Sequence, residues 1–512
     1  MSDSFASAIK IAAQEEAYAA VQGSAFKPTA VIEYQSRGQM LIIGKADSVS
    51  LLGDIPGSLT GETLLLDGLD PETVVSISGA LGQYEIEAGK QVLEADLVLD
   101  LSPQPILSMA LKPPGYLWVD ESSDFESVKV ELEALVGVFE KPKYFEYNES
   151  VCAHGRSGNQ GCTRCIDACP AQAISSLGDY VEVDPYRCHG GGICATVCPS
   201  GAIRYAYPAA EDLLNHVRTL ILTFTKAGGG APSIVFVNED QQQRAQHNMP
   251  GALIVCVEEV ASIGPEVWIS ALAWGARNIQ LFDLDKMPES SRSALDLHVK
   301  MVGAILGAMN YPASVVSVLS DLNDLIAIDV MPGIKAATSA ALDQKRQAFY
   351  MALDHLVEQA DKVKPVISLP TGSIFGEATV HADSCTLCLS CVSACPGNAL
   401  QAGGDKPQLG FVEVKCLQCG VCTSTCPEDA ITISPRLLLD QAARSTSRVL
   451  YEESPFYCIS CGKAFATTSG IAAILSRLVG HSMFADERAR LRLKMCSDCR
   501  VKDMMEDPST DI

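Results

Sequence analysis

The chain has 512 residues, with 38 Lys and Arg against 62 Asp and Glu, which gives a formal net charge of −24. A chain of this length is expected to form about three or four domains. Its 47% hydrophobic and 20% charged residues exclude disorder along the whole chain. The negative charge repels a phosphate backbone and excludes non-specific nucleic-acid binding, including binding by DNA-binding zinc fingers.

The amino-terminal twenty residues carry neither a secretory nor a twin-arginine signal, and no uncharged apolar run is long enough to span a bilayer. We therefore expect a cytoplasmic protein without a membrane span. Its 20 cysteines are clustered along the chain. In a reducing compartment, grouped cysteines bind metal more often than they form disulfides.

The first segment, residues 1–140, is predicted to be an α/β domain. Short apolar runs of strand length occupy residues 40–45, 63–68 and 92–101. No glycine fingerprint follows any of them, and Gly44 is followed directly by Lys45 and Ala46. A nucleotide site is therefore not expected in this segment.

A short unit recurs four times in two pairs, and each copy starts with a cysteine followed by proline. Four and five residues after that cysteine come an alanine and then an isoleucine or leucine. The proline ends a short helix, and the two apolar residues can pack under whatever the cysteines hold. The starting cysteines are Cys169, Cys198, Cys395 and Cys426. These repeats resemble the halves of bacterial dicluster ferredoxins.

Residues 141–208 form the first predicted dicluster module, and its opening half contains an insertion of nine residues between the first two cysteines. The four ligands predicted for one [4Fe–4S] cluster are Cys152, Cys162, Cys165 and Cys198. The inserted loop carries His154 and Arg156. These side chains would raise the potential of a nearby cluster, or they are ordinary solvated loop residues.

The closing half of this module lacks one cysteine, because Gly191 stands where the central one is expected. Cys169, Cys188 and Cys194 remain as three thiolates. Loss of the central position resembles the seven-iron ferredoxins, which implies a [3Fe–4S] cluster. The alternatives are a [4Fe–4S] cluster with His189 or an exogenous ligand, and a half that keeps ferredoxin packing but binds nothing.

Residues 209–340 are predicted to form a second α/β domain. Helical spacing covers residues 210–225, 265–274 and 290–309, and strands are expected at 233–237, 252–257, 278–284 and 314–319. Residues 253–260, 265–266 and 271–276 resemble the delta subunit of methyl-viologen-reducing hydrogenase. That family holds a cluster with several cysteines, whereas here only Cys256 is present, and we interpret it as a core residue. A helix over 343–362 lies within the predicted helical connector, residues 341–370.

The second predicted dicluster module, residues 371–435, contains two complete cysteine runs of the bacterial ferredoxin type. Three closely spaced thiolates of one run converge on one cluster, and the fourth cysteine reaches the neighbouring cluster. The first predicted [4Fe–4S] set is Cys385, Cys388, Cys391 and Cys426. The second is Cys416, Cys419, Cys422 and Cys395.

The remaining residues, 436–512, are predicted to be a zinc-binding tail with two Cys-x-x-Cys knuckles. Its four ligands are Cys458, Cys461, Cys496 and Cys499. One structural Zn²⁺ is favoured over a rubredoxin-like iron because residues 469–479 between the knuckles show helical spacing. Residues 436–457 are expected to be a connector in which Arg436 opens a helix and Pro455 breaks the chain, so that the knuckles form a separately folded appendage.

The sequence contains no Ser-His-Asp set, P-loop or Rossmann fingerprint. The fold class expected is therefore α/β multidomain with two ferredoxin-like dicluster modules, and the function is electron transfer by a polyferredoxin-like protein. The chain resembles proteobacterial iron–sulfur proteins associated with formate dehydrogenase and the ferredoxin-type subunits of hydrogenase complexes. That resemblance implies a hetero-complex in which the chain relays single electrons to or from such an oxidoreductase. Two alternatives are a redox enzyme with catalysis at the three-cysteine site, and a cluster-based redox regulator or assembly factor.

Overall fold

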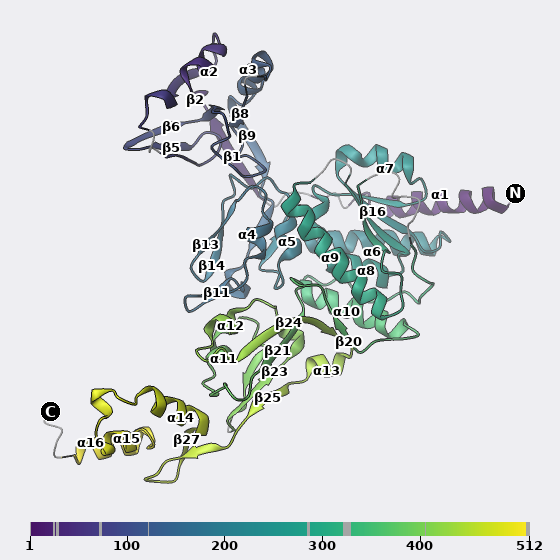
Figure 1. Ribbon diagram of the computed structural model, residues 1–512. Helices are drawn as coiled ribbons and strands as arrows, with labels where there is room; N and C mark the ends of the chain where they lie inside the picture. Colours follow the sequence, from purple (N-terminus) through teal and green to yellow (C-terminus); the bar gives the residue numbers. More distant parts are fainter. Residues whose placement is uncertain are drawn as a thin grey trace. The chain divides into compact units, whose positions relative to one another are not determined.

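Four parallel strands form the main sheet of the amino-terminal segment in the computed structural model (Figure 1). In spatial order they are β3 (Thr60–Leu65), β2 (Gln39–Gly44), β7 (Leu97–Leu101) and β8 (Tyr116–Trp118). Alternate residues of β2 are buried on opposite faces, with Ile42 in one apolar cluster and Ile43 in another. Burial on both faces is typical of parallel strands. The structure describes all residues except 1, 24–25, 27–29, 71–73, 121, 284–286, 321–328, 405 and 508–512, and only the backbone of 2–7.

Smaller elements complete this segment. β1 (Val31–Ser36) pairs with β9 (Gly137–Pro142), and β4 (Val75–Ser78), β5 (Tyr84–Ala88) and β6 (Gln91–Ala95) form an antiparallel sheet. The helical elements are α2 (Ala46–Leu51), η1 (Leu66–Gly68) and α3 (Phe125–Ala134).

The strand predicted at residues 40–45 is confirmed as β2, but the two other predictions for this segment need correction. The second strand ends at Leu65 and continues as a 3-10 turn. The run 92–101 is two strands, β6 and β7, separated at Asp96. The Asp96 carboxylate accepts hydrogen bonds from the backbone N–H of Arg37 at 2.5 Å and of Gln39 at 3.1 Å. These bonds fix Asp96, the residue between β6 and β7, against the start of β2.

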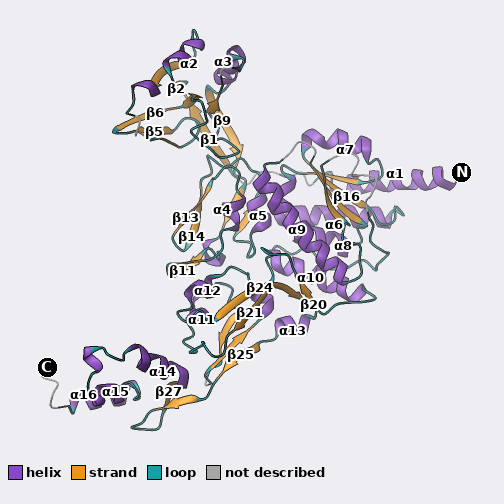
Figure 2. Cartoon of the chain, viewed as in Figure 1, coloured by secondary structure: helices purple, strands orange, loops and turns teal. Residues whose placement is uncertain are grey.

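A second parallel sheet lies between helices in the middle of the sequence (Figure 2). Its strand order is β17 (Leu253–Cys256), β16 (Ser233–Val237), β18 (Asn278–Phe282) and β19 (Val316–Leu319). The helices are α6 (Ala210–Lys226), α7 (Gln242–Asn248), α8 (Pro265–Ala273), α9 (Glu289–Ala308) and α10 (Lys345–Gln359). The predicted helices and strands of this region are confirmed with shifted ends, and Leu284 of one predicted strand lies outside the described residues.

The amino-terminal helix α1 (Ser2–Val21) is packed against strand β17 of this sheet. The Tyr18 hydroxyl accepts a hydrogen bond from the Ile254 N–H at 2.8 Å, and the Gln14 side chain donates to the Ala252 carbonyl at 2.8 Å. Covering an edge strand in this way removes a template for unwanted strand pairing.

The chain divides into two compact units. The first contains Met1–Ser150, Thr163–Leu177 and Val181–Asp361, and the second contains Val151–Cys162, Gly178–Tyr180 and Lys362–Ile512. In the first unit, β10 (Phe145–Tyr147) pairs with β15 (Ile203–Tyr205), and the short helices are α4 (Arg164–Ala168) and α5 (Ile193–Val197). Strand β13 (Ile174–Leu177) pairs with β14 (Tyr180–Val183). Each helix ends one residue before a Cys-Pro pair, as the repeat predicts.

The second unit is built on two small antiparallel sheets. One contains β20 (Val366–Ser368), β24 (Ile431–Leu438) and β21 (Gly376–Val380), and the other contains β22 (Leu400–Ala402), β23 (Gln408–Phe411) and β25 (Arg448–Glu452). The helical elements are α11 (Ser390–Ala394), η6 (Glu413–Lys415), α12 (Val421–Thr425) and α13 (Gln441–Ser445).

The prediction that Arg436 opens a helix is wrong. Arg436 and the leucines after it end strand β24, where they pair with β20, and α13 starts only after Asp440. The Arg436 guanidinium lies 2.7 Å from Glu377 and 2.7 Å from Glu413, and Arg448 contacts the same two carboxylates. Pairing with β20 and these ion pairs hold the chain extended here.

The carboxyl-terminal segment begins with a hairpin of β26 (Pro455–Tyr457) and β27 (Ala464–Thr467), followed by α14 (Thr468–Arg477), η7 (Ser482–Phe484), α15 (Glu487–Arg492) and α16 (Ser497–Met505). The helix predicted at residues 469–479 is confirmed as α14. The prediction of a separately folded appendage is wrong for residues 464–477. Thr467 donates to the Thr386 carbonyl at 2.8 Å, and Arg477 lies 2.6 Å from Glu428.

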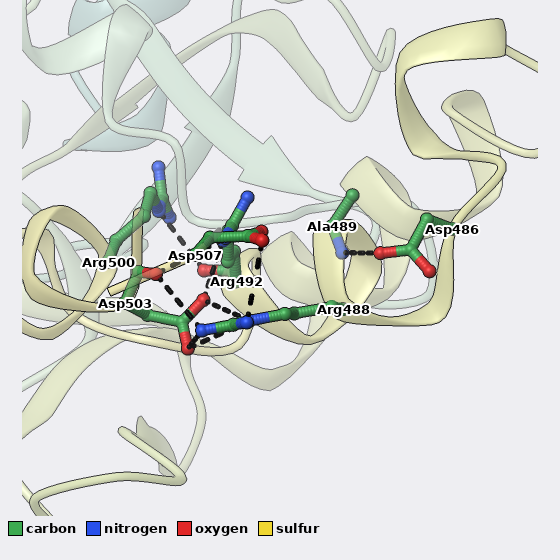
Figure 3. A network of polar contacts seen from close by, with 7 residues as sticks. All are labelled: Asp486, Arg488, Ala489, Arg492, Arg500, Asp503 and Asp507. Atoms are coloured by element: carbon green, nitrogen blue, oxygen red, sulfur yellow. Dashed lines mark hydrogen bonds and ion pairs between the residues drawn. The ribbon is translucent and has the colours of Figure 1, made fainter. Parts of the chain in front are cut away.

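Two arginines of α15 contact one aspartate of α16 and a second aspartate just after its end (Figure 3). Arg492 contacts the carboxylates of Asp503, at 2.6 Å, and Asp507, and Arg488 contacts the same two residues from 3.1 Å and 3.5 Å. Because Cys496 is the N-cap of α16 and Cys499 lies in its first turn, these ion pairs fix the second knuckle relative to α15.

Candidate iron–sulfur and metal centres

The two cysteine loops of the second module share one backbone pattern. In each, the third cysteine is the second residue of a short helix, Cys391 in α11 and Cys422 in α12. The residues before and after the second cysteine have left-handed backbone, with positive φ. They are Leu387 and Leu389 around Cys388, and Gln418 and Gly420 around Cys419. This repeated local geometry supports one binding mode for both loops.

The structure brings the predicted ligand sets of this module together in the crossed arrangement. Burial raises the pKa of Cys391 to about 12, and electrostatic repulsion from the nearby thiolates of Cys388, Cys385 and Cys426 raises it further. Burial likewise raises the pKa of Cys422, and repulsion from Cys419, Cys416 and Cys395 adds to that shift. Four thiols held this close are costly to ionise without a cation, and iron is a cation that stabilises their thiolate forms.

Backbone N–H groups point at the sulfurs that follow the helices. The Ala399 N–H donates to Cys395 Sγ at 3.3 Å, and the Ala430 N–H donates to Cys426 Sγ at 3.3 Å. The Gln418 amide donates to Cys416 Sγ at 3.5 Å. Hydrogen bonds to cluster sulfurs are one of the features that set reduction potential. The donor set therefore fits iron–sulfur clusters, and sequence reasoning missed Gln418.

The incomplete loop of the first module keeps the backbone pattern of the complete ones. Gly190 and Gly192 have positive φ, like Gln418 and Gly420, and Gly191 lies between them in the position of the second cysteine. Cys194 is the second residue of α5, as Cys422 is in α12. The loop therefore has the backbone conformation of the complete loops but a glycine in place of the second cysteine.

The three glycines differ in the space around them. A Cβ on Gly190 would lie 2.8 Å from the Tyr144 ring, and one on Gly192 would lie 2.4 Å from Ser262 Cβ. Among the described residues, no atom lies within 4 Å of a Cβ placed on Gly191. Glycine is thus required at two of the positions by close packing, whereas Gly191 leaves open space at the place of the missing thiolate.

The three thiols predicted for this site lie together in the first unit. Desolvation of the half-buried Cys194 raises its pKa well above the ordinary value, and the charges of Cys188, Cys169 and Cys165 raise it further. Cys198 lies in the same unit, whereas Cys152 and Cys162 belong to the second unit. The four-cysteine set of Cys152, Cys162, Cys165 and Cys198 therefore stays a prediction from the spacing.

Two lysines that sequence reasoning did not single out contact the incomplete loop, Lys141 through its side chain and Lys112 through its backbone. Lys141 Nζ donates to the Cys188 carbonyl at 2.7 Å, and burial lowers its pKa to about 8. Lys112 offers its backbone carbonyl to Nε2 of His189 at 2.7 Å. Since a carbonyl oxygen only accepts hydrogen bonds, Nε2 of His189 carries the proton. Nδ1 of the neutral ring then keeps its lone pair, and Nδ1 is therefore the atom that would bind a metal.

Two further sequence interpretations concern Cys256 and the inserted loop. Cys256 ends β17 half-buried, and burial raises its pKa to about 11, which agrees with a packing role. His154 of the inserted loop is only 1% exposed, and its Nδ1 donates to the Cys162 carbonyl at 2.9 Å, whereas Arg156 is exposed. The solvated interpretation of the loop therefore holds for Arg156 and not for His154.

The four tail cysteines converge on one point. The sulfur atoms of Cys458, Cys461, Cys496 and Cys499 all lie within 4.8 Å of one another. The Cys496 N–H donates to Cys458 Sγ at 3.3 Å. Burial opposes ionisation of Cys458, but backbone N–H donors from Cys496, Cys461 and Ser460 lower its pKa to about 6. A tetrahedral metal with four thiolate ligands fits this donor set.

Comparison with known proteins supports the two modules separately. Residues 160–202 and residues 382–431 each match a family model described as a 4Fe-4S dicluster domain. A ferredoxin from Methanothermococcus thermolithotrophicus is 40% identical over 57 residues, which cover 11% of this chain and 93% of that ferredoxin. Among the described residues, no helix has the length and apolar character needed to cross a membrane.

Proposed function

We propose that this chain, which belongs to the ferredoxin family through its dicluster modules, is a polyferredoxin that passes single electrons between two redox proteins. The observation that carries the proposal is the crossed grouping of eight cysteines in the second module, repeated in part in the first. A bound iron–sulfur cluster accepts and releases one electron at a time. The chain's own part is to hold the thiolates, point N–H groups at them and exclude water.

The proposed metal content has three parts. Three [4Fe–4S] clusters are held by Cys152, Cys162, Cys165 and Cys198, by Cys385, Cys388, Cys391 and Cys426, and by Cys416, Cys419, Cys422 and Cys395. A fourth cluster is held by Cys169, Cys188 and Cys194, either as [3Fe–4S] or as [4Fe–4S] with a ligand other than cysteine. One Zn²⁺ is held by Cys458, Cys461, Cys496 and Cys499.

The partner is proposed to be an oxidoreductase of the formate dehydrogenase or hydrogenase type, in a hetero-complex. The net charge of −24 supports a partner with a basic docking surface. The clustering of the cysteines along the chain supports a reducing compartment, and cytoplasmic localisation stays a prediction.

A second candidate is catalysis at the incomplete cluster. The open space at Gly191 favours it, because an iron without a cysteine ligand can take a small exogenous molecule. Under this alternative, added small ligands change the spectrum of that cluster alone.

The test is a redox titration of anaerobically purified protein, followed by single-turnover mixing with a reduced hydrogenase or formate dehydrogenase. We expect several one-electron steps and stoichiometric reduction of the clusters by the partner. Protein that holds iron but takes up no electrons would contradict the proposed function.

A further inference from the structure

The insertion between Cys152 and Cys162 is an ordered hairpin rather than an open loop. Its strands are β11 (Gly155–Arg156) and β12 (Asn159–Gln160), which pair antiparallel. The base is closed by hydrogen bonds from the Gly161 N–H to the His154 carbonyl at 2.6 Å and from the Cys162 N–H to the Ala153 carbonyl at 2.9 Å.

Asp179 orders the tip of the hairpin. Its carboxylate accepts hydrogen bonds from the backbone N–H of Ser157 at 2.8 Å and of Gly158 at 2.9 Å. With the base closed on itself and the tip held by Asp179, the hairpin can hold Cys162 in one place.

The hairpin lies against helix α12 of the second module, within the second unit. The Ser424 hydroxyl donates to the Gln160 carbonyl at 3.0 Å. Close packing surrounds Gly161, since a Cβ there would lie 2.3 Å from Val421 Cγ2 and 3.1 Å from the Cys419 carbonyl oxygen. Glycine at position 161 therefore allows the backbone next to Cys162 to reach the backbone of Cys419.

Cys162 directly follows Gly161, so the same contact brings its backbone beside that of Cys419. Cys419 is a ligand proposed for one cluster of the second module, whereas the sequence assigns Cys162 to a cluster of the first.

We propose that this hairpin is the electron-transfer junction between the two dicluster modules, with Gly161 as its contact point and Cys162 and Cys419 as the facing ligands. The inference rests on the proposed function. One electron crosses the junction at a time, from a reduced group on one thiolate to an oxidised group on the other, and no bond is made or broken and no proton moves. The nine residues between Cys152 and Cys162 would then serve to place a ligand of the first module beside the second module.

The test uses the full chain with its metals, and its main variant is Gly161→Ala. The added methyl group meets Val421 and Cys419, so it should push the hairpin from α12. A single electron is injected by flash photoreduction, and freeze-quench EPR follows its redistribution. We expect redistribution between modules to slow roughly tenfold, since a small displacement of a positioned group has large kinetic effects. Amide hydrogen exchange of residues 153–162 should accelerate, which is a readout independent of electron transfer.

The chain offers a matched control, and the hairpin a rescue. Gly307→Ala adds the same methyl group in helix α9, where φ is not positive and no described atom lies within 4 Å of the added Cβ, and should leave redistribution unchanged. The double variant Gly161→Ala with Val421→Ala removes the atom that is contacted most closely and should recover much of the wild-type rate. Equal slowing in Gly307→Ala, or a wild-type rate in Gly161→Ala despite faster exchange, would overturn the junction.

A milder variant covers the case in which Gly161→Ala loses iron. Ser424→Ala removes the hydrogen bond to Gln160 and touches no cysteine, so it should slow redistribution while the iron content stays constant. An unchanged rate in that variant, with iron intact, counts against the junction. If wild-type protein takes up no electrons, the proposed function itself fails, which is a distinguishable result.

Discussion

Gly191 occupies in the first module the position that Cys419 occupies in the second. Each lies between two residues of positive φ, and each precedes a short helix whose second residue is a cysteine. The loop of the first module has the same conformation although it lacks this thiolate. We therefore expect the residue at position 191, glycine or cysteine, to decide which type of cluster the site holds.

Gly191→Cys should convert the site into a four-cysteine one. Gly191 has open space at its Cβ position, so the new side chain fits without displacing Tyr144 or Ser262. In oxidised protein we expect the S = 1/2 EPR signal of a [3Fe–4S] cluster to disappear and the iron content to rise by about one atom per chain. Gly191→Ala fills the same space without a thiolate and should leave the spectrum as in wild type.

His189→Ala separates the two cluster alternatives. If Nδ1 of His189 ligates a fourth iron, this variant should change the spectrum and Gly191→Cys should restore it. If the site is a [3Fe–4S] cluster, the variant should lose only the hydrogen bond to Lys112 and keep the signal. An EPR spectrum unaffected by both Gly191→Cys and His189→Ala would mean that this half binds nothing.

Local sequence patterns predicted most of the regular structure. The apolar runs around Ile42 and Ile254 and the helical spacing of α6, α8 and α9 each depend on neighbours a few residues away. The extended chain at Arg436 was missed because its cause is distant, namely the carboxylates of Glu377 and Glu413 on other elements. Three consecutive leucines after an arginine also suit a helix, so tertiary contacts decided the outcome.

The cysteine spacing predicted which thiols come together, but not what surrounds them. The spacing of Cys416, Cys419 and Cys422 suffices for the grouping, since a loop of three-residue steps leaves few alternatives. The inserted hairpin lies on α12 through a hydrogen bond between residues 160 and 424. No local sequence pattern predicts a contact between segments so far apart in the chain. The glycine at 161 was the available signal, because a glycine directly before a ligand indicates close approach of another backbone.

Removing the charge of Arg436 should destabilise the second module. Arg436 contacts both Glu377 and Glu413, and Glu413 is 5% exposed. Arg436→Met leaves the buried Glu413 carboxylate with one positive partner fewer. Breaking a buried ion pair in this way is expected to lower the free energy of unfolding by about 3 kcal/mol. Denaturant unfolding followed by cluster absorbance measures this change. Lys129→Met, which breaks the ion pair with the exposed side chain of Glu126, serves as the control and should cost less than about 1 kcal/mol.

The stability of the first unit should fall as pH rises through the folded-state pKa of Glu259. Burial raises that pKa to about 7, Asn238 opposes the shift by hydrogen bonding, and Glu258, Asp283 and Asp240 add to it. A raised carboxyl pKa contributes stability that is fully present below the unfolded value, near 4.5, and is lost as pH approaches and passes 7. Glu259→Gln should therefore remove on the order of 2 kcal/mol of this pH dependence.

Thermal unfolding between pH 5 and pH 8 measures the effect of Glu259→Gln. The variant should be more stable than wild type at pH 8 and should show a flatter profile. Glu289→Gln, at an exposed position on α9, is the matched control and should keep the wild-type profile. An unchanged slope in Glu259→Gln would assign the pH dependence to other groups.

Metal analysis of anaerobically purified protein tests the whole set of proposed sites. We expect about 15 iron atoms per chain with a three-iron fourth cluster, about 16 with a four-iron one, and about one zinc. Iron near eight, the content of one complete dicluster module, would contradict the clusters proposed for Cys152 to Cys198.

Loss of a tail ligand should affect stability without affecting the clusters. Cys458 is buried among the four convergent sulfurs, and its Sγ accepts the Cys496 N–H, so Cys458→Ser weakens both the metal site and the contact between the two knuckles. Zn²⁺ has no redox chemistry, and four thiolates leave it no open position. We therefore expect a lower melting temperature and loss of zinc, with iron content and cluster potentials unchanged. Ser497→Ala, next to the same knuckle but not a ligand, should retain zinc and stability. If Cys458→Ser instead keeps full stability and loses electron transfer, and the wild-type site holds iron, a rubredoxin-like centre is the better account.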